Sequence, residues 1–210
     1  MEFVLTITAL VLSVVIHEYA HGWVASKRGD ETARLAGRLT LNPLKHIDPV
    51  GTILVPLMLR LMHVSPLGWA KPVPVNFAKL HNPRRDMILV AAAGPAVNFL
   101  AACVFTVLLK SDFLFALLPT KSAGYVFIFF VYLIYINLLL GVFNLIPLPP
   151  LDGSRIMVAL LPQPLARMYH QLEPFGLVIL IILLNLGFLD FVGKIVSLLF
   201  DKLGPLLLPS

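Results

Sequence analysis

The sequence predicts an all-α integral membrane protein with about four transmembrane helices, a re-entrant or interfacial segment and a short β-ribbon. Of its 210 residues, 59% are hydrophobic and 13% are charged, which is about half the charged fraction of an average soluble domain. Leu, Ile, Val and Phe form long uninterrupted blocks. Segments of alternating polarity, which a transmembrane barrel requires, are scarce. Helices therefore are the expected spanning elements, because they satisfy their own backbone hydrogen bonds.

Four apolar runs predict the spanning helices. Residues 3–26 contain one charged residue, Glu18, and are long enough as a helix to cross a hydrocarbon core of about 30 Å. Residues 87–109 and 122–151 contain no charged residue, and each predicts a further span. The fourth run, residues 174–189, is shorter and reaches spanning length only if it continues through residues 190–193.

Two segments between the first and second runs are apolar but do not predict spans. Residues 50–63 contain Arg60 and His63 and would reach only about 22 Å as a helix extended to Val64, so a re-entrant or interfacial segment is expected. The stretch "WAKPVPVNF", residues 69–77, alternates proline with apolar residues. Because proline is tolerated in edge strands, this stretch predicts an extended ribbon.

The distribution of basic residues predicts the orientation in the membrane. If residues 50–63 do not cross, then segments 27–48, 64–86 and 152–173 share one side and carry eleven Lys and Arg residues, whereas the other side carries four. The basic side is expected to be cytoplasmic, with the N-terminus outside. We therefore expect a multi-pass protein of a prokaryotic plasma membrane, built as one membrane-embedded domain over residues 1–210.

The net charge of +5 does not indicate a nucleic-acid partner, because the basic residues lie between apolar runs, where they orient helices in the bilayer. The expected surroundings are lipid. The single cysteine, Cys103, lies inside an apolar run and permits no internal disulfide.

The motif "HEYAH", residues 17–21, places polar side chains inside the first span. His17 and His21 lie four residues apart and share one face of a helix, so both imidazoles can bind the same ion. Glu18 lies beside the water that such an ion holds, and can take its proton during attack on a carbonyl. Polar contacts between helices are the alternative reading, but ionisable residues inside a span are functional by default.

A third ligand is expected, since catalytic zinc sites use three protein ligands and a water. Asp152 follows thirty uncharged residues, in "NLIPLPPLDGSR", where prolines allow the helix to unwind and the carboxylate to turn inward. If residues 50–63 do not cross, the third span ends on the same side of the membrane as His21. Asp152, which follows that span, can then reach the metal. An ordinary helix-capping turn is the alternative reading of "LDG".

These motifs resemble the site-2 protease family of intramembrane metalloproteases. The resemblance rests on "HEYAHGWVASKRGD", "GRLTLNPLKHIDPVGTILVP", "AAAGPAVNF" and "FNLIPLPPLDG", which occur in the family's order and cover most of residues 10–160. It implies one Zn²⁺ per chain held by His17, His21 and Asp152, with Glu18 as the catalytic base. It also implies a three-helix catalytic core (3–26, 87–109 and 122–148). Finally, it implies that the substrates are helical membrane proteins, which in this family are often trimmed beforehand by an upstream protease.

Six further residues are candidates for catalysis or for substrate binding. Asn144, near the unwound segment, is a candidate for oxyanion stabilisation or for holding the substrate backbone. Asn98, in "GPAVN", is a candidate substrate contact, or equally part of a close helix packing motif. In the ribbon, Trp69, Lys71, Val73 and Val75 are candidates for capturing an unwound substrate by β-strand addition. An interfacial anchoring loop is the alternative there.

The resemblance is to a compact branch, since the twelve residues 110–121 leave no room for an inserted PDZ-like domain and no nucleotide-binding domain follows residue 200. Two other classes of function are weighed. A catalytically silent zinc-binding scaffold predicts a degraded motif, but Glu18 is present. A metal or proton transporter predicts ionisable residues in several spans and inverted repeats, and neither is found. A prenyl-protein endopeptidase would share HExxH but not the "LDG" segment.

Overall fold

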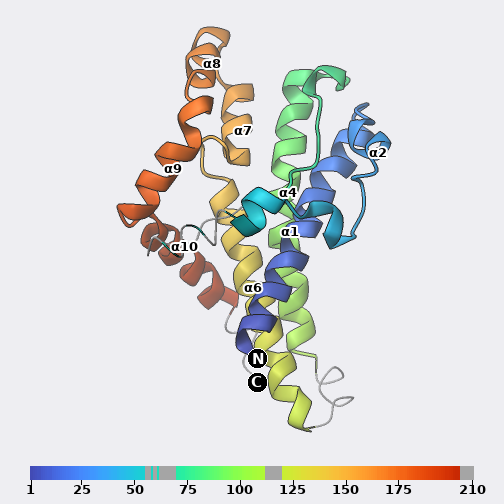
Figure 1. The fold of residues 1–210 in the computed structure, drawn as a ribbon, viewed down its shortest axis with the longest axis vertical. Helices are drawn as coiled ribbons and strands as arrows, with labels where there is room; N and C mark the ends of the chain where they lie inside the picture. The colour runs from blue at the N-terminus through green and yellow to red at the C-terminus, as the bar shows by residue number, and fades with distance from the viewer. Residues whose placement is uncertain (55–57, 59–60, 62–69, 112–119, 204–210) are drawn as a thin grey trace.

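The computed structural model describes residues 1–54, 58, 61, 70–111 and 120–203, and this part of the chain contains helices and connecting segments but no strand. Figure 1 shows the arrangement. The elements in chain order are α1 (Glu2–Lys27), α2 (Thr32–Leu35), η1 (Pro43–His46), η2 (Pro49–Leu54), η3 (Phe77–Lys79), α4 (Pro83–Leu109), α6 (Thr120–Asn144), α7 (Asp152–Leu160), α8 (Gln163–His170), η4 (Glu173–Phe175), α9 (Gly176–Asn185) and α10 (Phe188–Leu203).

The three long helices α1, α4 and α6 pack against one another and form the centre of the molecule (Figure 1). They confirm the first three predicted spans, with shifted ends. Helix α4 begins at Pro83, four residues earlier than its apolar run, because proline suits the first helical position and Asp86 accepts a hydrogen bond from the Asn82 N–H at 2.8 Å. Helix α6 ends at Asn144, ahead of the prolines that follow.

The fourth span differs from the predicted run. Gln163–Asn185, which comprises α8, η4 and α9, is the fourth stretch long and apolar enough to cross a membrane, whereas the sequence predicts residues 174–193. The chain turns after α9 at Gly187, whose φ of 84° lies in the left-handed region that favours glycine. The apolar residues beyond that turn start a separate helix, α10, because the helical backbone ends there.

Apolar side chains cover much of the outer surface of these helices. Large exposed examples are Leu100 and Val107 on α4 and Val178 and Ile182 on α9. A soluble monomer rarely exposes so much contiguous apolar surface. Surfaces of this kind fit hydrocarbon surroundings, so the structure agrees with a membrane protein.

The chain leaves α1 and enters α4 at the same end of the bundle. The His81 N–H donates to the Arg28 carbonyl at 2.8 Å, and Arg28 Nε lies 3.8 Å from Asp86 Oδ1. The end of α1 and the start of α4 are therefore adjacent, and residues 28–82 make no net crossing. In the predicted re-entrant segment 50–63, residues 50–54 belong to η2. Most of residues 55–63 lie outside the described part of the chain.

The predicted β-ribbon is not present in the described part of residues 69–77. Residues 70–76, called here the anchored segment, are extended without a partner strand. Their backbone is held instead by loops and side chains. The Lys71 N–H donates to the His46 carbonyl at 2.8 Å, and its carbonyl accepts from Arg38 Nη2 at 2.7 Å. The Asn76 N–H donates to Asp30 Oδ2 at 2.6 Å. These partners take the place of a neighbouring strand.

Candidate metal centre

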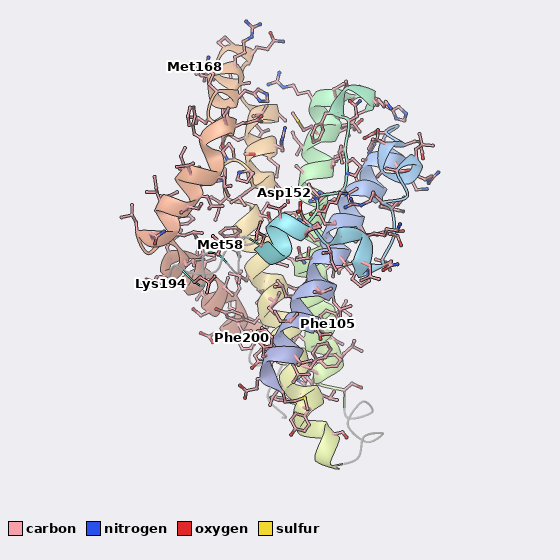
Figure 2. All side chains as sticks on the ribbon, in the orientation of Figure 1. Met58, Phe105, Asp152, Met168, Lys194 and Phe200 are labelled. Atoms are coloured by element: carbon pink, nitrogen blue, oxygen red, sulfur yellow. The ribbon has the colours of Figure 1, made fainter. Side chains whose placement is uncertain are left out.

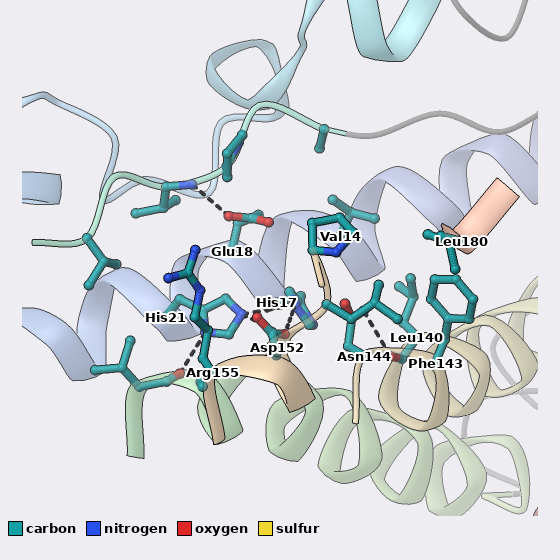
Figure 3. Close-up of a pocket in the computed structure, with 18 of the residues that line it drawn as sticks. Val14, His17, Glu18, His21, Leu140, Phe143, Asn144, Asp152, Arg155 and Leu180 are labelled. Carbon is teal, nitrogen blue, oxygen red and sulfur yellow. Dashed lines mark hydrogen bonds and ion pairs between the residues drawn. The ribbon is translucent and has the colours of Figure 1, made fainter. Parts of the chain in front are cut away.

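Three side chains predicted as metal ligands come together between α1, α4 and α7. His17 Nε2 and His21 Nε2 lie 3.0 Å apart, and Asp152 Oδ2 lies 3.1 Å from the first and 3.2 Å from the second. Figure 3 shows the two rings and the carboxylate meeting at one point. Donors on a tetrahedral zinc with bonds of about 2.0–2.1 Å are themselves about 3.3 Å apart, so the spacing and the chemistry of this donor set fit zinc.

Asp152 reaches the histidines because the chain between α6 and α7 folds back sharply. Asp152 is the first residue of α7, and its carboxylate faces His17 and His21. Gly153 allows the close return, since a Cβ at this position would lie 2.3 Å from the Leu145 carbonyl oxygen. Figure 2 shows Asp152 well inside the molecule, while Met168 of α8 lies at its end. The "LDG" segment therefore directs the carboxylate into the bundle rather than serving as a simple cap.

Asp152 is charged at neutral pH. Burial by itself would raise the pKa of its carboxyl group, but the adjacent imidazoles of His17 and His21 outweigh burial and lower the pKa to about 2. The site therefore offers two imidazoles and a carboxylate as ligands, which is the mixed N and O donor set of catalytic zinc sites.

Gly94 lets α4 approach the two histidines. A Cβ at this position would lie 2.4 Å from His21 Nε2 and 2.6 Å from His17 Nε2, distances at which one of the groups must move. Gly94 is not among the residues predicted from the sequence, although it lies in the "AAAGP" stretch of small residues that is typical of close helix packing.

We expect Gly94→Ala to reduce bound zinc strongly, because the methyl group would occupy the space into which both donor nitrogens project. Metal analysis of the purified protein measures this. Gly193→Ala is the matched control, since a Cβ at Gly193 meets no atom within 4 Å. Equal zinc content in the two variants would contradict the proposed position of the ion.

Glu18 lies on α1 beside His17, His21 and Asp152, whose three ligand atoms are called here the donor cluster, and it lines a cavity together with them. Its Oε2 accepts a hydrogen bond of 2.7 Å from the Val73 N–H of the anchored segment (Figure 3). A carboxylate held by one oxygen in this way keeps its other oxygen available as a proton acceptor. The anchored segment thus orients the residue that the sequence predicts as the base.

A cavity of about 660 Å³ opens onto the donor cluster, and it is lined mainly by apolar side chains. Val73 and Val75 of the anchored segment line it, and so does Asn144, whose Nδ2 donates to the Leu140 carbonyl of its own helix at 3.0 Å. Lys71 is exposed and is not among the lining residues. Trp69 lies outside the described residues.

Asn98, a candidate substrate contact from the sequence, lies outside the wall of the cavity. It is 0% exposed and does not line the cavity. Its Oδ1 lies 2.5 Å from His17 Nδ1, and its Nδ2 donates to Asn137 Oδ1 at 2.7 Å. Asn137 is not among the residues predicted from the sequence, although an asparagine within an uncharged span is itself a signal of a buried polar contact.

Arg84 fastens α7 to the start of α4. Its Nε donates to the Ala159 carbonyl at 2.6 Å and its Nη2 to the Leu161 carbonyl at 2.8 Å. These are carbonyls at the C-terminal end of α7, which lack partners within the helix. The helix that begins with Asp152 is thereby fixed at its other end. Nothing in the sequence pattern pointed to this role.

Comparison with known proteins assigns the chain to a family. The model of peptidase family M50 matches residues 5–117 and 114–184. YwhC of Bacillus subtilis, provisionally named a zinc metalloprotease, is 41% identical over 179 residues, which cover 84% of this chain and 78% of that protein. Rip2 of Mycolicibacterium smegmatis, also provisionally named a zinc metalloprotease, is 27% identical over 87% of this chain and 67% of its own length.

A more distant match reaches a longer archaeal protein. Zinc metalloprotease MJ0392 of Methanocaldococcus jannaschii is 29% identical over 152 residues, which cover 72% of this chain and 33% of that protein. No solved structure matches the chain. The family match extends over the first three spans, the donor cluster and the "LDG" segment, and the chain belongs to peptidase family M50, the site-2 protease family.

Proposed function

We propose that this protein is an intramembrane zinc endopeptidase that hydrolyses peptide bonds of transmembrane-helix substrates within or near the bilayer. The observation that carries the proposal is the convergence of His17, His21 and Asp152 on one point beside Glu18. The names of the relatives as zinc metalloproteases support it. One donor cluster of this kind occurs among the described residues, which supports one zinc per chain.

The chain's own residues supply positioning and proton transfer. His17, His21 and Asp152 would hold zinc, which when bound polarises a carbonyl and lowers the pKa of a bound water to about 7. Glu18 accepts the proton of the attacking water and delivers it to the leaving amine nitrogen. Asn144, which lines the same cavity, would donate to the developing oxyanion or to the substrate backbone.

The apolar side chains that line the cavity support the proposal that the substrate is an apolar helix. Leu140 and Phe143 of α6 and Leu180 of α9 line it together with the valines of the anchored segment. A helical substrate must unwind before its amides are accessible. We therefore keep the anchored segment as the proposed substrate contact, with its side chains carrying the interaction, because the Lys71 and Val73 N–H groups needed for strand addition are already bonded to His46 and Glu18.

We expect Val75→Asp to reduce cleavage while zinc content stays unchanged, because the carboxylate would place a charge on an apolar wall of the cavity without touching the donor cluster. Lys71→Asp is the matched control on the same segment, since Lys71 does not line the cavity. Cleavage of a membrane substrate and metal content are measured on both. Full cleavage by the Val75 variant would remove the anchored segment from the substrate site.

The proposed orientation places the N-terminus outside and the donor cluster toward the cytoplasmic side of a prokaryotic plasma membrane. The end of the bundle that carries α2, α7 and α8 (Figure 1) is also the end with most Lys and Arg residues, which are typical of cytoplasmic loops.

The proposal is tested by comparing the membrane proteomes of cells that carry the wild-type protein with cells that carry Glu18→Gln. A membrane protein that accumulates only with the variant, and whose shortened form appears only with wild type, establishes proteolysis and nominates the substrate. Identical proteomes, with zinc bound to both proteins, would favour a zinc-binding scaffold instead.

A further inference from the structure

We propose that Asn98 is a positioning residue for His17, and that its amide oxygen fixes which nitrogen of the His17 ring is free to bind metal. A buried hydrogen-bond relay of Ser13, Asn98 and Asn137 shows which way that amide faces. The inference rests on the proposed zinc site. It concerns residues outside the cavity, none of which can touch a substrate, since Ser13, Asn98 and Asn137 are all 0% exposed.

The direction of the relay is set by backbone carbonyls, which can only accept. Asn137 Nδ2 donates to the Leu133 carbonyl at 2.8 Å and to Ser13 Oγ at 2.8 Å. Ser13 Oγ in turn donates to the Ala9 carbonyl at 2.7 Å, so it must accept from Asn137. The amide nitrogen of Asn137 is therefore fixed on this side, because a flipped amide would set its oxygen against a carbonyl.

The same reasoning fixes Asn98. Asn137 Oδ1 faces Asn98 at 2.7 Å and can only accept, so Asn98 turns its Nδ2 toward it. That nitrogen also lies 3.3 Å from the Ser13 carbonyl, a second acceptor. Asn98 Oδ1 is left facing His17 Nδ1 at 2.5 Å. An amide oxygen can only accept, so His17 must carry its proton on Nδ1.

A neutral imidazole with its proton on Nδ1 has a free lone pair on Nε2, and His17 Nε2 is the atom that meets His21 and Asp152. His21 is fixed in the same tautomer by a different partner, because its Nδ1 lies 2.7 Å from the Val90 carbonyl. The two ligands thus differ in one respect. The partner of His21 belongs to the backbone, whereas the partner of His17 is a side chain that can be exchanged.

The relay also joins the three central helices, since Ser13, Asn98 and Asn137 come from α1, α4 and α6. A purely structural role would therefore be the competing explanation. It predicts that loss of either asparagine has similar consequences. A positioning role predicts that the consequences for metal binding depend on which asparagine is lost, because only Asn98 contacts the ligand.

The test measures zinc affinity by competition with a chelator on purified full-length protein. We expect Asn98→Leu to weaken zinc binding by about 10–100-fold, the loss typical of a partner that orients a ligating histidine. Asn137→Leu is the matched control, buried in the same core. It should bind zinc nearly as the wild type does, because Asn98 still donates to the Ser13 carbonyl and keeps its oxygen on His17. Equal losses in both variants would overturn the proposal.

A second measurement is made on the unaltered protein, and a variant serves only to assign the signal. Nitrogen-15 NMR of the histidine rings in the zinc-loaded protein should show a proton on His17 Nδ1 that exchanges slowly with water. Comparison with His17→Gln assigns the signal. A His17 ring without a proton on Nδ1 would contradict the relay.

The two proposals fail in different ways. If His17→Ala binds zinc as tightly as wild type, then the proposed metal site is wrong. If His17→Ala loses zinc while Asn98→Leu keeps it, then the metal site stands and the relay alone is wrong.

Discussion

Glu18→Gln is expected to retain zinc and to cleave its substrate about 10²–10⁴-fold more slowly than the wild type, the contribution typical of a general base. The amide has nearly the shape of the carboxylate and can still accept the hydrogen bond from the Val73 N–H. Glu18 is not one of the three proposed zinc ligands, so the substitution leaves the donor cluster unchanged. What it loses is the ability to take a proton from water and return it to the leaving nitrogen.

The measurement pairs single-turnover cleavage of a reconstituted substrate with metal analysis of the same preparation. Glu2→Gln is the control, because it makes the same exchange at the exposed start of the same helix. Undiminished cleavage by Glu18→Gln would exclude Glu18 as the base. Loss of zinc together with cleavage would show instead that the side chain holds the site together.

Asp152→Ala is expected to lower zinc affinity by more than about 100-fold, because it removes a ligand. Even the loss of a hydrogen-bond partner that orients a ligand typically lowers metal affinity by about 10–100-fold. Two histidines on one turn of helix remain. They leave zinc one protein donor short of the three used in catalytic sites. Cleavage should be lost together with the metal, unlike the result expected for Glu18→Gln.

Chelator competition on the purified protein measures this loss, and thermal unfolding of the metal-free protein shows whether the fold is retained. Asp201→Ala on α10 removes an exposed carboxylate from a surface position and serves as the control. If Asp152→Ala binds zinc as the wild type does, then a different residue must complete the donor set.

Much of the site was predictable because two of its three metal ligands lie within one helix. The spacing of His17 and His21 places both rings on one helical face wherever that helix lies, and an apolar run around three ionisable residues indicates function in any membrane protein. The three central helices were likewise predicted within a few residues. Their lengths follow from the thickness of a bilayer, and their ends from prolines and caps.

The fourth span and the ribbon were predicted less well. Apolar character continues past Asn185, but the backbone turns at Gly187 and divides the run into α9 and α10. Residues 70–76 have the composition of a strand, yet three of their N–H groups donate to a carbonyl at the end of η1 and to two carboxylates. A strand needs a partner strand, and composition does not say whether one is present.

By itself, the sequence determined the membrane class, the three central spans and the chemical types of the ligands, since these depend on composition and on contacts within one helix. The tertiary structure alone decided how Asp152, 131 residues from His21, joins it, why α4 needs Gly94, and which side chain faces His17 Nδ1. Those features depend on distances and hydrogen-bond directions between separate helices. The pattern of residues along one helix does not predict such contacts, because they arise only when α1, α4, α6 and α7 pack together.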